Sequence, residues 1–463
     1  MTPSTRSAGL KRVISGRMLL LFVVGDVLGA GIYALVGQVG GRVGGAIWTA
    51  FLVALGLALF TAFAYAELVT KYPKAAGAAL YVNKAWRRPF VTFLVAFAVM
   101  CSGLTSAAAL SRAFGGDYLS VFLDVPTVVA AVLFILAVAL VNFRGISESV
   151  RLNVVLTSIE LTGLLLVMVI GIGAIADGGA SVDPGRVFEF KEGESIAAAI
   201  MGGAGLAFFA LIGFEDSVNV AEEARDPSRD YPRALLGGLL IAGTVYLLVT
   251  TVASMAVPTA QLARSDGPLL EVVQTGPLSM STKVFSAIAL FALANGALIN
   301  MIMASRILYG MANEGILPRA LGRVEPRRGT PWVAIAATTA IAVMLIVSGD
   351  LSGLADTTVL LLLLVFTAVN VAVLVLRRDP VAHRHFRTPT AIPVIGAAVS
   401  VGLMTTKEPA VFARAGALLL VGIAFWALNR LVRGHHPGAY GTEDEGLEGR
   451  DAASEVAAGA ASR

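Results

Sequence analysis

GDVLGAGIYALVG, residues Gly25–Gly37, lies inside the first long apolar run of a 463-residue chain. The stretch places the carboxylate of Asp26 among closely spaced glycines, where a spanning helix would normally be regular and apolar. An acidic side chain at membrane depth is costly and usually marks the path of an ion or a substrate. Glycines at that depth indicate a helix that breaks and leaves backbone amides and carbonyls for a ligand. The stretch therefore predicts a helical membrane transporter.

The composition of the chain also indicates a membrane protein. Hydrophobic residues make up 57% of the sequence and charged residues 14%, whereas soluble domains carry roughly 25% charged residues. The formal net charge of +4 comes from basic residues between apolar runs. Such residues are topology signals and do not indicate a nucleic-acid partner. We expect the lipid bilayer as the environment, and the sequence does not set an oligomeric state.

About twelve apolar runs are long enough to cross a bilayer, which takes roughly 20 helical residues. They are residues 18–40, 46–70, 90–113, 126–143, 154–176, 196–221, 234–257, 283–310, 332–348, 353–376, 391–406 and 410–432. These runs predict an all-α integral membrane protein with one transporter domain, residues 18–432. We expect 1–17 to be a cytoplasmic N-terminal segment. We expect 433–463 to be a disordered cytoplasmic tail, because it turns acidic and then Ala- and Gly-rich.

The distribution of basic residues predicts the orientation of the chain. With the N-terminus inside, most of the 35 lysines and arginines fall in cytoplasmic loops, as the positive-inside rule requires. We therefore expect a multi-pass protein of a cytoplasmic membrane with both termini in the cytoplasm.

A second broken segment lies in the sixth apolar run. Residues Gly202–Asp216, GGAGLAFFALIGFED, interrupt that run as Gly25–Gly37 interrupts the first. Interrupted runs at corresponding places in two halves indicate an inverted-repeat transporter, and a spacing of five helices makes the halves antiparallel. The expected halves are residues 18–176 and 196–376, with the last two helices, 391–432, outside the repeat.

The two breaks together suit one kind of ligand. A break at Gly29–Gly31 leaves a half-helix beginning near Ile32, whose N-terminal amides favour a carboxylate. A break around Phe209–Gly213 leaves carbonyls, such as those of Phe209 and Ala210, for an ammonium group. An α-amino acid carries both groups. For the glycines alone, close packing of small residues between helices is the alternative explanation.

Asp26, Glu160 and Glu215 are carboxylates within apolar runs. Asn153, Thr157 and Glu160 recur on one helix face, which should turn away from lipid. We expect Glu215 to lie near the start of the second half of the sixth helix, where a helix N-terminus would stabilise its charge. All four histidines lie outside the runs, so carboxylates must carry any coupling proton, and neither a resident metal nor a histidine relay is expected. The alternative for each acid is a buried structural carboxylate with hydrogen-bond partners.

Other residues in the runs give weaker signals. Asn300 and Ser106 are candidates to line a cavity, and Asn300 is counted among the substrate-binding residues. Hydrogen bonds between helices explain such polar residues equally well. Phe208 and Phe209, beside the second break, could close over a substrate, although core packing is the default for aromatic residues.

Four segments resemble those of amino acid–polyamine–organocation (APC) permeases, in the order that the family shows. They are Gly25–Gly37, similar to the family's G-x-x-x-G-x-G-I-[FY] segment; Ala66–Val82, similar to the connection between its second and third helices; Phe208–Ala234, similar to its broken sixth helix and the following loop; and Ala304–Pro318, similar to the end of its eighth helix. The resemblance implies a LeuT-type fold, with five-plus-five inverted repeats, broken helices 1 and 6, and two further helices.

The resemblance also implies roles for single residues. It assigns the substrate carboxylate to the backbone of the first break: Gly29, Ala30 and Gly31. It assigns the substrate amine to the backbone of the second: Phe209, Ala210 and Ile212. Phe209 would also be an aromatic gate. Several relatives carry a lysine on helix five that stands in for a bound sodium, and here that position holds Glu160.

We therefore expect a secondary active transporter that moves amino acids by alternating access and is coupled to protons. Glu160 is the expected coupling residue and Asp26 the second candidate, while a sodium site or a cationic substrate would use the same acids. No cofactor besides the coupling ion is expected, and the partner is a small amino acid or amine. The alternatives are an exchanger or exporter of polyamines or other organic cations, and an amino-acid sensor that does not transport. The runs contain no nucleophile–base pair, which argues against an enzyme.

Overall fold

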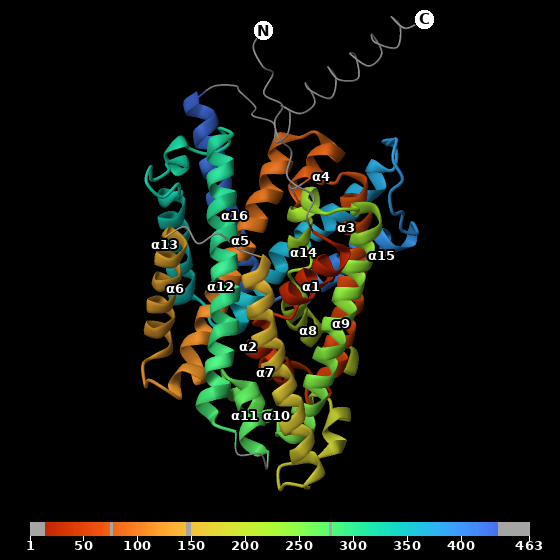
Figure 1. The fold of residues 1–463 in the computed structure, drawn as a ribbon, viewed down its shortest axis with the longest axis vertical. Helices are drawn as coiled ribbons and strands as arrows, with labels where there is room; N and C mark the ends of the chain where they lie inside the picture. The colour runs from red at the N-terminus through yellow and green to blue at the C-terminus, as the bar shows by residue number, and fades with distance from the viewer. Residues whose placement is uncertain (1–13, 75–76, 145–149, 277–279, 434–463) are drawn as a thin grey trace, which may run out of the picture.

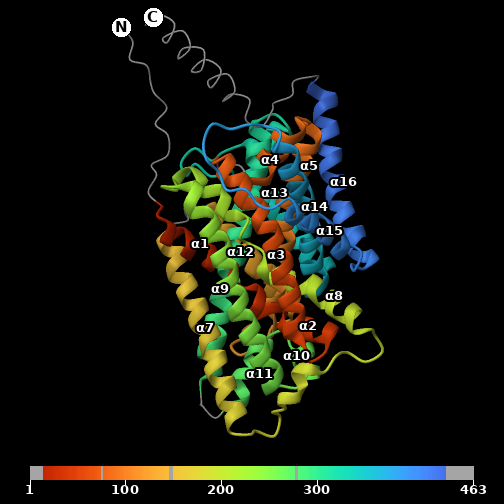
Figure 2. The same ribbon diagram turned by 90° about the vertical axis from the view of Figure 1, so that its right-hand side faces the viewer.

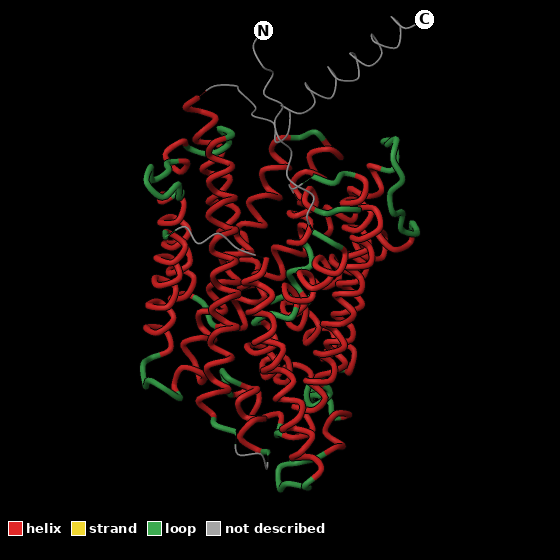
Figure 3. Tube along the Cα trace, in the orientation of Figure 1, coloured by secondary structure: helices red, strands yellow, loops and turns green. Residues whose placement is uncertain are grey.

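The computed structural model describes residues 14–74, 77–144, 150–276 and 280–433. Over these residues the chain is a bundle of helices without a strand, as Figure 3 shows. The described chain begins with a contact between segments far apart in the sequence, because Ile14, before the first apolar run, forms an isolated β-bridge with Ala224, after the second break. The expected cytoplasmic tail, residues 433–463, lies outside the described residues except for Arg433, and so does most of the N-terminal segment.

Eight spans among the described residues are long and apolar enough to cross a membrane. They contain α3 (Ile47–Lys71), α5 (Pro89–Ala113) with η1 (Phe114–Tyr118), α7 (Val150–Ala176), α8 (Ile196–Ala207) with η3 (Phe208–Leu211) and η4 (Asp216–Glu223), α9 (Pro227–Ala256), α12 (Thr282–Asn313), α14 (Leu351–Leu376) and α16 (Pro409–Arg433).

A ninth span is the pair α1 (Gly16–Val27) and α2 (Gly31–Val43), which is bent by 45° at the break. Three shorter apolar helices follow the remaining predicted runs: α6 (Thr127–Phe143), α13 (Trp332–Ser348) and α15 (Ala391–Met404). Every predicted run thus falls on helix, and nine of these spans meet the length of a membrane crossing.

Short helices cover the ends of the bundle. They are α4 (Gly77–Trp86), η2 (Pro184–Phe188), α10 (Thr259–Arg264), α11 (Pro268–Thr275) and η5 (Arg319–Gly322). Figures 1 and 2 both show α10 and α11 at one end of the bundle and α4 at the other. We call these the α10–α11 end and the α4 end.

Helix α5 forms the centre of the bundle and packs against α12 and α14. Pro89 starts α5 at a position where a helix needs no backbone donor, and small residues such as Ala107, Ala108 and Ala109 let its neighbours approach closely. The apolar part of α5 is 83% buried, against 17% for α16. Helix α16 therefore lies on the outside of the bundle, and the polar groups of α5 have a protein environment.

Candidate functional site

The first break comes at the expected place. Helix α1 ends at Val27, Leu28 leaves the helical region, and α2 begins at Gly31, one residue before the expected start. The carbonyl of Val27 accepts a hydrogen bond of 2.5 Å from the hydroxyl of Tyr246 on α9. A buried carbonyl beside the break therefore keeps a partner.

The second break includes a residue in a backbone conformation that favours glycine. Helix α8 ends at Ala207, a single 3₁₀ turn follows, Ile212 is extended and Gly213 has φ +123°, a value that favours glycine. The prediction that an α-helix follows the second break is wrong. The segment that follows, η4, is a 3₁₀ segment with a non-helical residue inside it. Glu215 is accordingly stabilised by accepting the amide of Gly213 at 2.9 Å, and not by the N-terminus of an α-helix.

The two breaks touch each other, and two glycines allow it. A Cβ atom at Gly31 would lie 2.7 Å from the Cα of Ala210, and one at Gly213 would lie 2.7 Å from the carbonyl oxygen of Asp26. A Cβ at Gly29 would meet nothing closer than 3.5 Å. Close packing, the alternative explanation for the glycines, therefore holds for Gly31 and does not explain Gly29.

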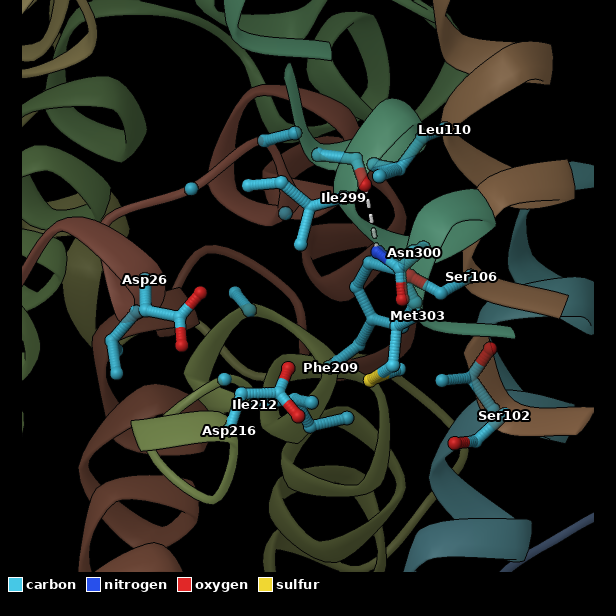
Figure 4. A pocket seen from close by; sticks show the side chains of 18 of the residues that line it. Asp26, Ser102, Ser106, Leu110, Phe209, Ile212, Asp216, Ile299, Asn300 and Met303 are labelled. Carbon is cyan, nitrogen blue, oxygen red and sulfur yellow. Dashed lines mark hydrogen bonds between the residues drawn. The ribbon is translucent and has the colours of Figure 1, made fainter. Parts of the chain in front are cut away.

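A cavity of about 90 Å³ lies between the breaks and helices α5, α7, α12 and α14 (Figure 4). All the residues predicted to bind substrate or to couple transport line it: Gly29, Ala30, Gly31, Phe209, Ala210, Ile212, Asn300, Glu160 and Asp26. The cavity thus brings together residues from both halves of the sequence, although their roles in binding stay predictions. Phe208, by contrast, is buried in the core against Phe366.

Several cavity-lining residues are not predicted from the sequence. They are Ser102 on α5, Asp216 at the start of η4, Met303 on α12 and Thr358 on α14, among others. Figure 4 shows the carboxylates of Asp26 and Asp216 directed into the same cavity from the two broken segments. Asp216 ends the stretch Gly202–Asp216 that marks the second break, so its position beside Glu215 is the signal that could have found it.

The cavity is acidic. Asp26, Glu160, Glu215 and Asp216 line it, and none of its described lining residues is a lysine, arginine or histidine. The four acids are distributed around the walls, since no three described His, Cys, Asp or Glu residues come close enough to hold a metal ion. Low-dielectric surroundings strengthen the field of buried carboxylates. The cavity is therefore suited to a proton or to a cationic group.

Glu160 has few partners among the described residues. Its side chain is only 2% exposed, and its Oε1 accepts one hydrogen bond of 3.3 Å from Asn295 on α12. Its Oε2 is buried and has no hydrogen-bond partner within the described part of the chain. The expected inward face of α7 is confirmed at Thr157, which is buried against Gly25, while the side chain of Asn153 lies outside the described residues. A buried carboxylate with so few partners is costly when ionised.

A second group of charged side chains differs from Glu160, because its members are paired with one another. Asp356, near the start of α14, accepts hydrogen bonds from Lys407 with one oxygen and from Arg42 with the other. Lys407, in the loop between α15 and α16, also donates to the carbonyl of Gly205 at 2.8 Å. Burial lowers the pKa of Lys407, and Asp356 partly offsets this effect. We call Arg42, Asp356 and Lys407 the charged triad.

The sequence pattern of the family described as "Amino acid permease" matches residues 14–427. The chain belongs to this amino acid permease family. The match covers both breaks and every helix that lines the cavity, and it confirms the resemblance of the four sequence segments. Members of this kind are transporters, so the chain is a multi-pass membrane transporter and not an enzyme.

Three relatives illustrate the range of the family. The chain is 25% identical over 407 residues to the branched-chain amino acid permease BcaP of Bacillus subtilis (strain 168), which covers 83% of this chain and 85% of the relative. It is 30% identical over 392 residues to cationic amino acid transporter 4, vacuolar, of Arabidopsis thaliana, covering 80% of this chain and 64% of the relative. It is 25% identical over 427 residues to the methylthioribose transporter of Bacillus subtilis (strain 168), covering 87% and 90%.

Proposed function

We propose that this chain is a proton-coupled amino acid permease of a cytoplasmic membrane that works by alternating access. The observation that carries the proposal is the small cavity lined by both breaks. The first amides of α2 have no acceptor within their own helix, and they begin at Gly31 beside the cavity. They suit the carboxylate of an amino acid, and the neighbouring second break at Phe209 and Ala210 suits its ammonium group.

The proposal makes Glu160 the proton carrier. A neutral, protonated Glu160 fits a buried position with one long hydrogen bond better than an ionised one does. Opening of the cavity to one side would let water solvate the carboxylate and release the proton. Repeated closing and opening to opposite sides would then move the proton together with the substrate.

The architecture that we propose for this cycle is a LeuT-type fold with twelve spans. The three shorter apolar helices added to the nine spans give that number, and they coincide with predicted runs. Contact between the first and sixth broken spans supports five-plus-five repeats. The positions of lysines and arginines support cytoplasmic termini, although one relative is a vacuolar protein.

Uptake into proteoliposomes tests the proposal. We expect Glu160→Gln to abolish accumulation driven by a pH gradient and to leave counterflow exchange of the same amino acid intact. Glu194→Gln is the matched control, because Glu194 is exposed in the loop before α8. Accumulation at the wild-type level in the Glu160→Gln variant would refute the proton-carrier role.

A second candidate function is exchange or export of an organic cation. The observation in its favour is the set of four carboxylates without a basic residue in the cavity. A thermal-shift competition screen separates the two functions, because a ligand stabilises the state that it binds. Agmatine or putrescine should compete better than any neutral amino acid if the substrate is a cation, and worse if it is not; methylthioribose belongs in the same screen.

A further inference from the structure

Tyr33 connects helix α2, which follows the first break, to helix α7, which carries Glu160. It lies in the first turn of α2, fully buried, and its hydroxyl donates a hydrogen bond of 2.6 Å to the main-chain carbonyl of Glu160 on α7. Its own main-chain carbonyl accepts the hydroxyl of Tyr118 at 2.9 Å, and its ring packs against Phe285. A phenylalanine would fill the same space. The hydroxyl group therefore serves the contact with Glu160.

Helix α7 is shaped to receive this hydroxyl. Gly163 lies one turn after Glu160, and a Cβ atom there would come within 2.3 Å of the oxygen of Tyr33 and within 2.7 Å of Ile288. The missing side chain leaves a notch where the tyrosine reaches the α7 backbone. Residues on two helices, Tyr33 and Gly163, thus fit one contact.

Glu160 is held from two directions. Tyr33 holds its main chain from α2, and Asn295 holds its side chain from α12. The titratable groups that face it from the other packed elements are Asp26 on α1 and Tyr246 on α9, with Glu215 and Asp216 across the cavity. Glu271 of α11 instead accepts a hydrogen bond from Gln261 at the surface. The placement of α7 by Tyr33 therefore helps to set where the Glu160 carboxylate lies.

The contact also connects α7 to the breaks that are proposed to bind substrate. Gly31, two residues before Tyr33, packs directly against Ala210 in the cavity wall. A rearrangement of the first break around a ligand moves α2, and α2 then either carries Glu160 with it or releases it.

We propose that Tyr33 is a positioning residue that couples the movement of α2 to the proton site at Glu160. The proposal rests on the proposed function, because it takes Glu160 as the proton carrier. Tyr33 itself is not among the described residues that line the cavity. Its hydroxyl transmits the position of the first break to α7.

The test measures the pH profile of uptake in proteoliposomes together with ligand-induced thermal shift. In Tyr33→Phe we expect pH-driven accumulation to fall about fivefold to tenfold, the equivalent of one buried hydrogen bond. Counterflow exchange and the thermal shift should stay within about twofold of wild type. Tyr231→Phe is the matched control, since it removes an equally buried hydroxyl that donates to a main-chain carbonyl, that of Ser217, away from Glu160.

Gly163→Ala tests the same contact from the other helix. The new methyl group should push the hydroxyl from its notch and reproduce the Tyr33→Phe profile, whereas Gly56→Ala, where a Cβ meets nothing within 4 Å, should not. A wild-type pH profile in both Tyr33→Phe and Gly163→Ala, with accumulation lost in Glu160→Gln, would overturn the role of Tyr33 alone. Wild-type accumulation in Glu160→Gln would instead overturn the proposed function.

Discussion

Two buried acids, Glu160 and Asp356, have equal exposure and opposite surroundings. Each side chain is about 2% exposed. Both oxygens of Asp356 accept hydrogen bonds from cations, Arg42 and Lys407. Glu160 has one long hydrogen bond and, within the described residues, an Oε2 without a hydrogen-bond partner. A carboxylate with fixed partners holds structure together, whereas one without them has room for a proton or ligand that comes and goes.

The largest effect should come from breaking the charged triad. Asp356→Asn leaves Lys407 as a buried cation without its counterion and should lower the free energy of unfolding by about 3 to 5 kcal/mol. Glu160→Gln replaces a buried carboxyl group that has only one hydrogen bond, and it should leave stability unchanged or higher. Thermal denaturation in detergent compares the two variants, with Asp356→Asn combined with Lys407→Met as a partial rescue. Equal destabilisation by both single variants would contradict the distinction.

A second comparison concerns the glycines of the first break. Gly31→Ala forces a methyl group against the backbone of Ala210, and we expect it to lower stability by about 1 to 3 kcal/mol and to abolish uptake. Gly29→Ala meets no close atom and should change stability by less than about 0.5 kcal/mol. Its methyl group would narrow the cavity and raise the KM for uptake. Equal thermal stability of the two variants would show that the breaks do not pack as described.

Asp216 distinguishes the two candidate functions. If the substrate carries a second positive charge, Asp216→Asn should weaken competition by agmatine or putrescine about tenfold, the effect of one charge-assisted hydrogen bond. Binding of neutral amino acids should change little. Competition assays on the purified variant measure both, and an equal loss for charged and neutral ligands would argue against a side-chain subsite at Asp216.

The smallest effect concerns Asp266 at the α10–α11 end, an acid influenced by both Asp117 and Arg112. Burial raises the pKa of Asp266, the nearby Asp117 adds to this, and Arg112 partly offsets it. A folded-state pKa above the unfolded value favours the protonated carboxyl, so the ionised group costs stability at neutral pH; this cost begins to fall as pH drops through the folded-state pKa and is gone below the unfolded one. Asp266→Asn should therefore raise the melting temperature slightly at pH 7 and less near pH 4. An equal shift at both pH values would assign the effect to packing.

The residues that form the cavity could be predicted because their chemistry is unusual for a membrane span. Glycines and acids inside apolar runs, such as Gly29, Asp26 and Glu160, stand out in the sequence, and the structure brings them together. Residues that look ordinary in sequence could not be predicted in the same way. Lys407 reads as a loop charge and Asp356 as an acid near the start of the predicted run 353–376, and only the structure shows that they pair.

The conformation of the second break shows a similar limit. Its sequence contains helix breakers but does not distinguish an α-helical second half from the 3₁₀ segment that follows Gly213. The contact between Tyr33 and Glu160 is likewise invisible in sequence, because 127 residues separate the pair and the notch at Gly163 is one glycine among the 49 of the chain.

The central claim is that Glu160 moves a proton together with an amino acid. The most direct measurement records the internal pH of proteoliposomes with a trapped dye after an amino acid is added outside, without an imposed pH gradient. The wild-type protein should acidify the interior as substrate enters, and Glu160→Gln should take up substrate toward equilibrium without acidification. Acidification at the wild-type rate in Glu160→Gln, or its absence in the wild-type protein during uptake, would contradict the claim.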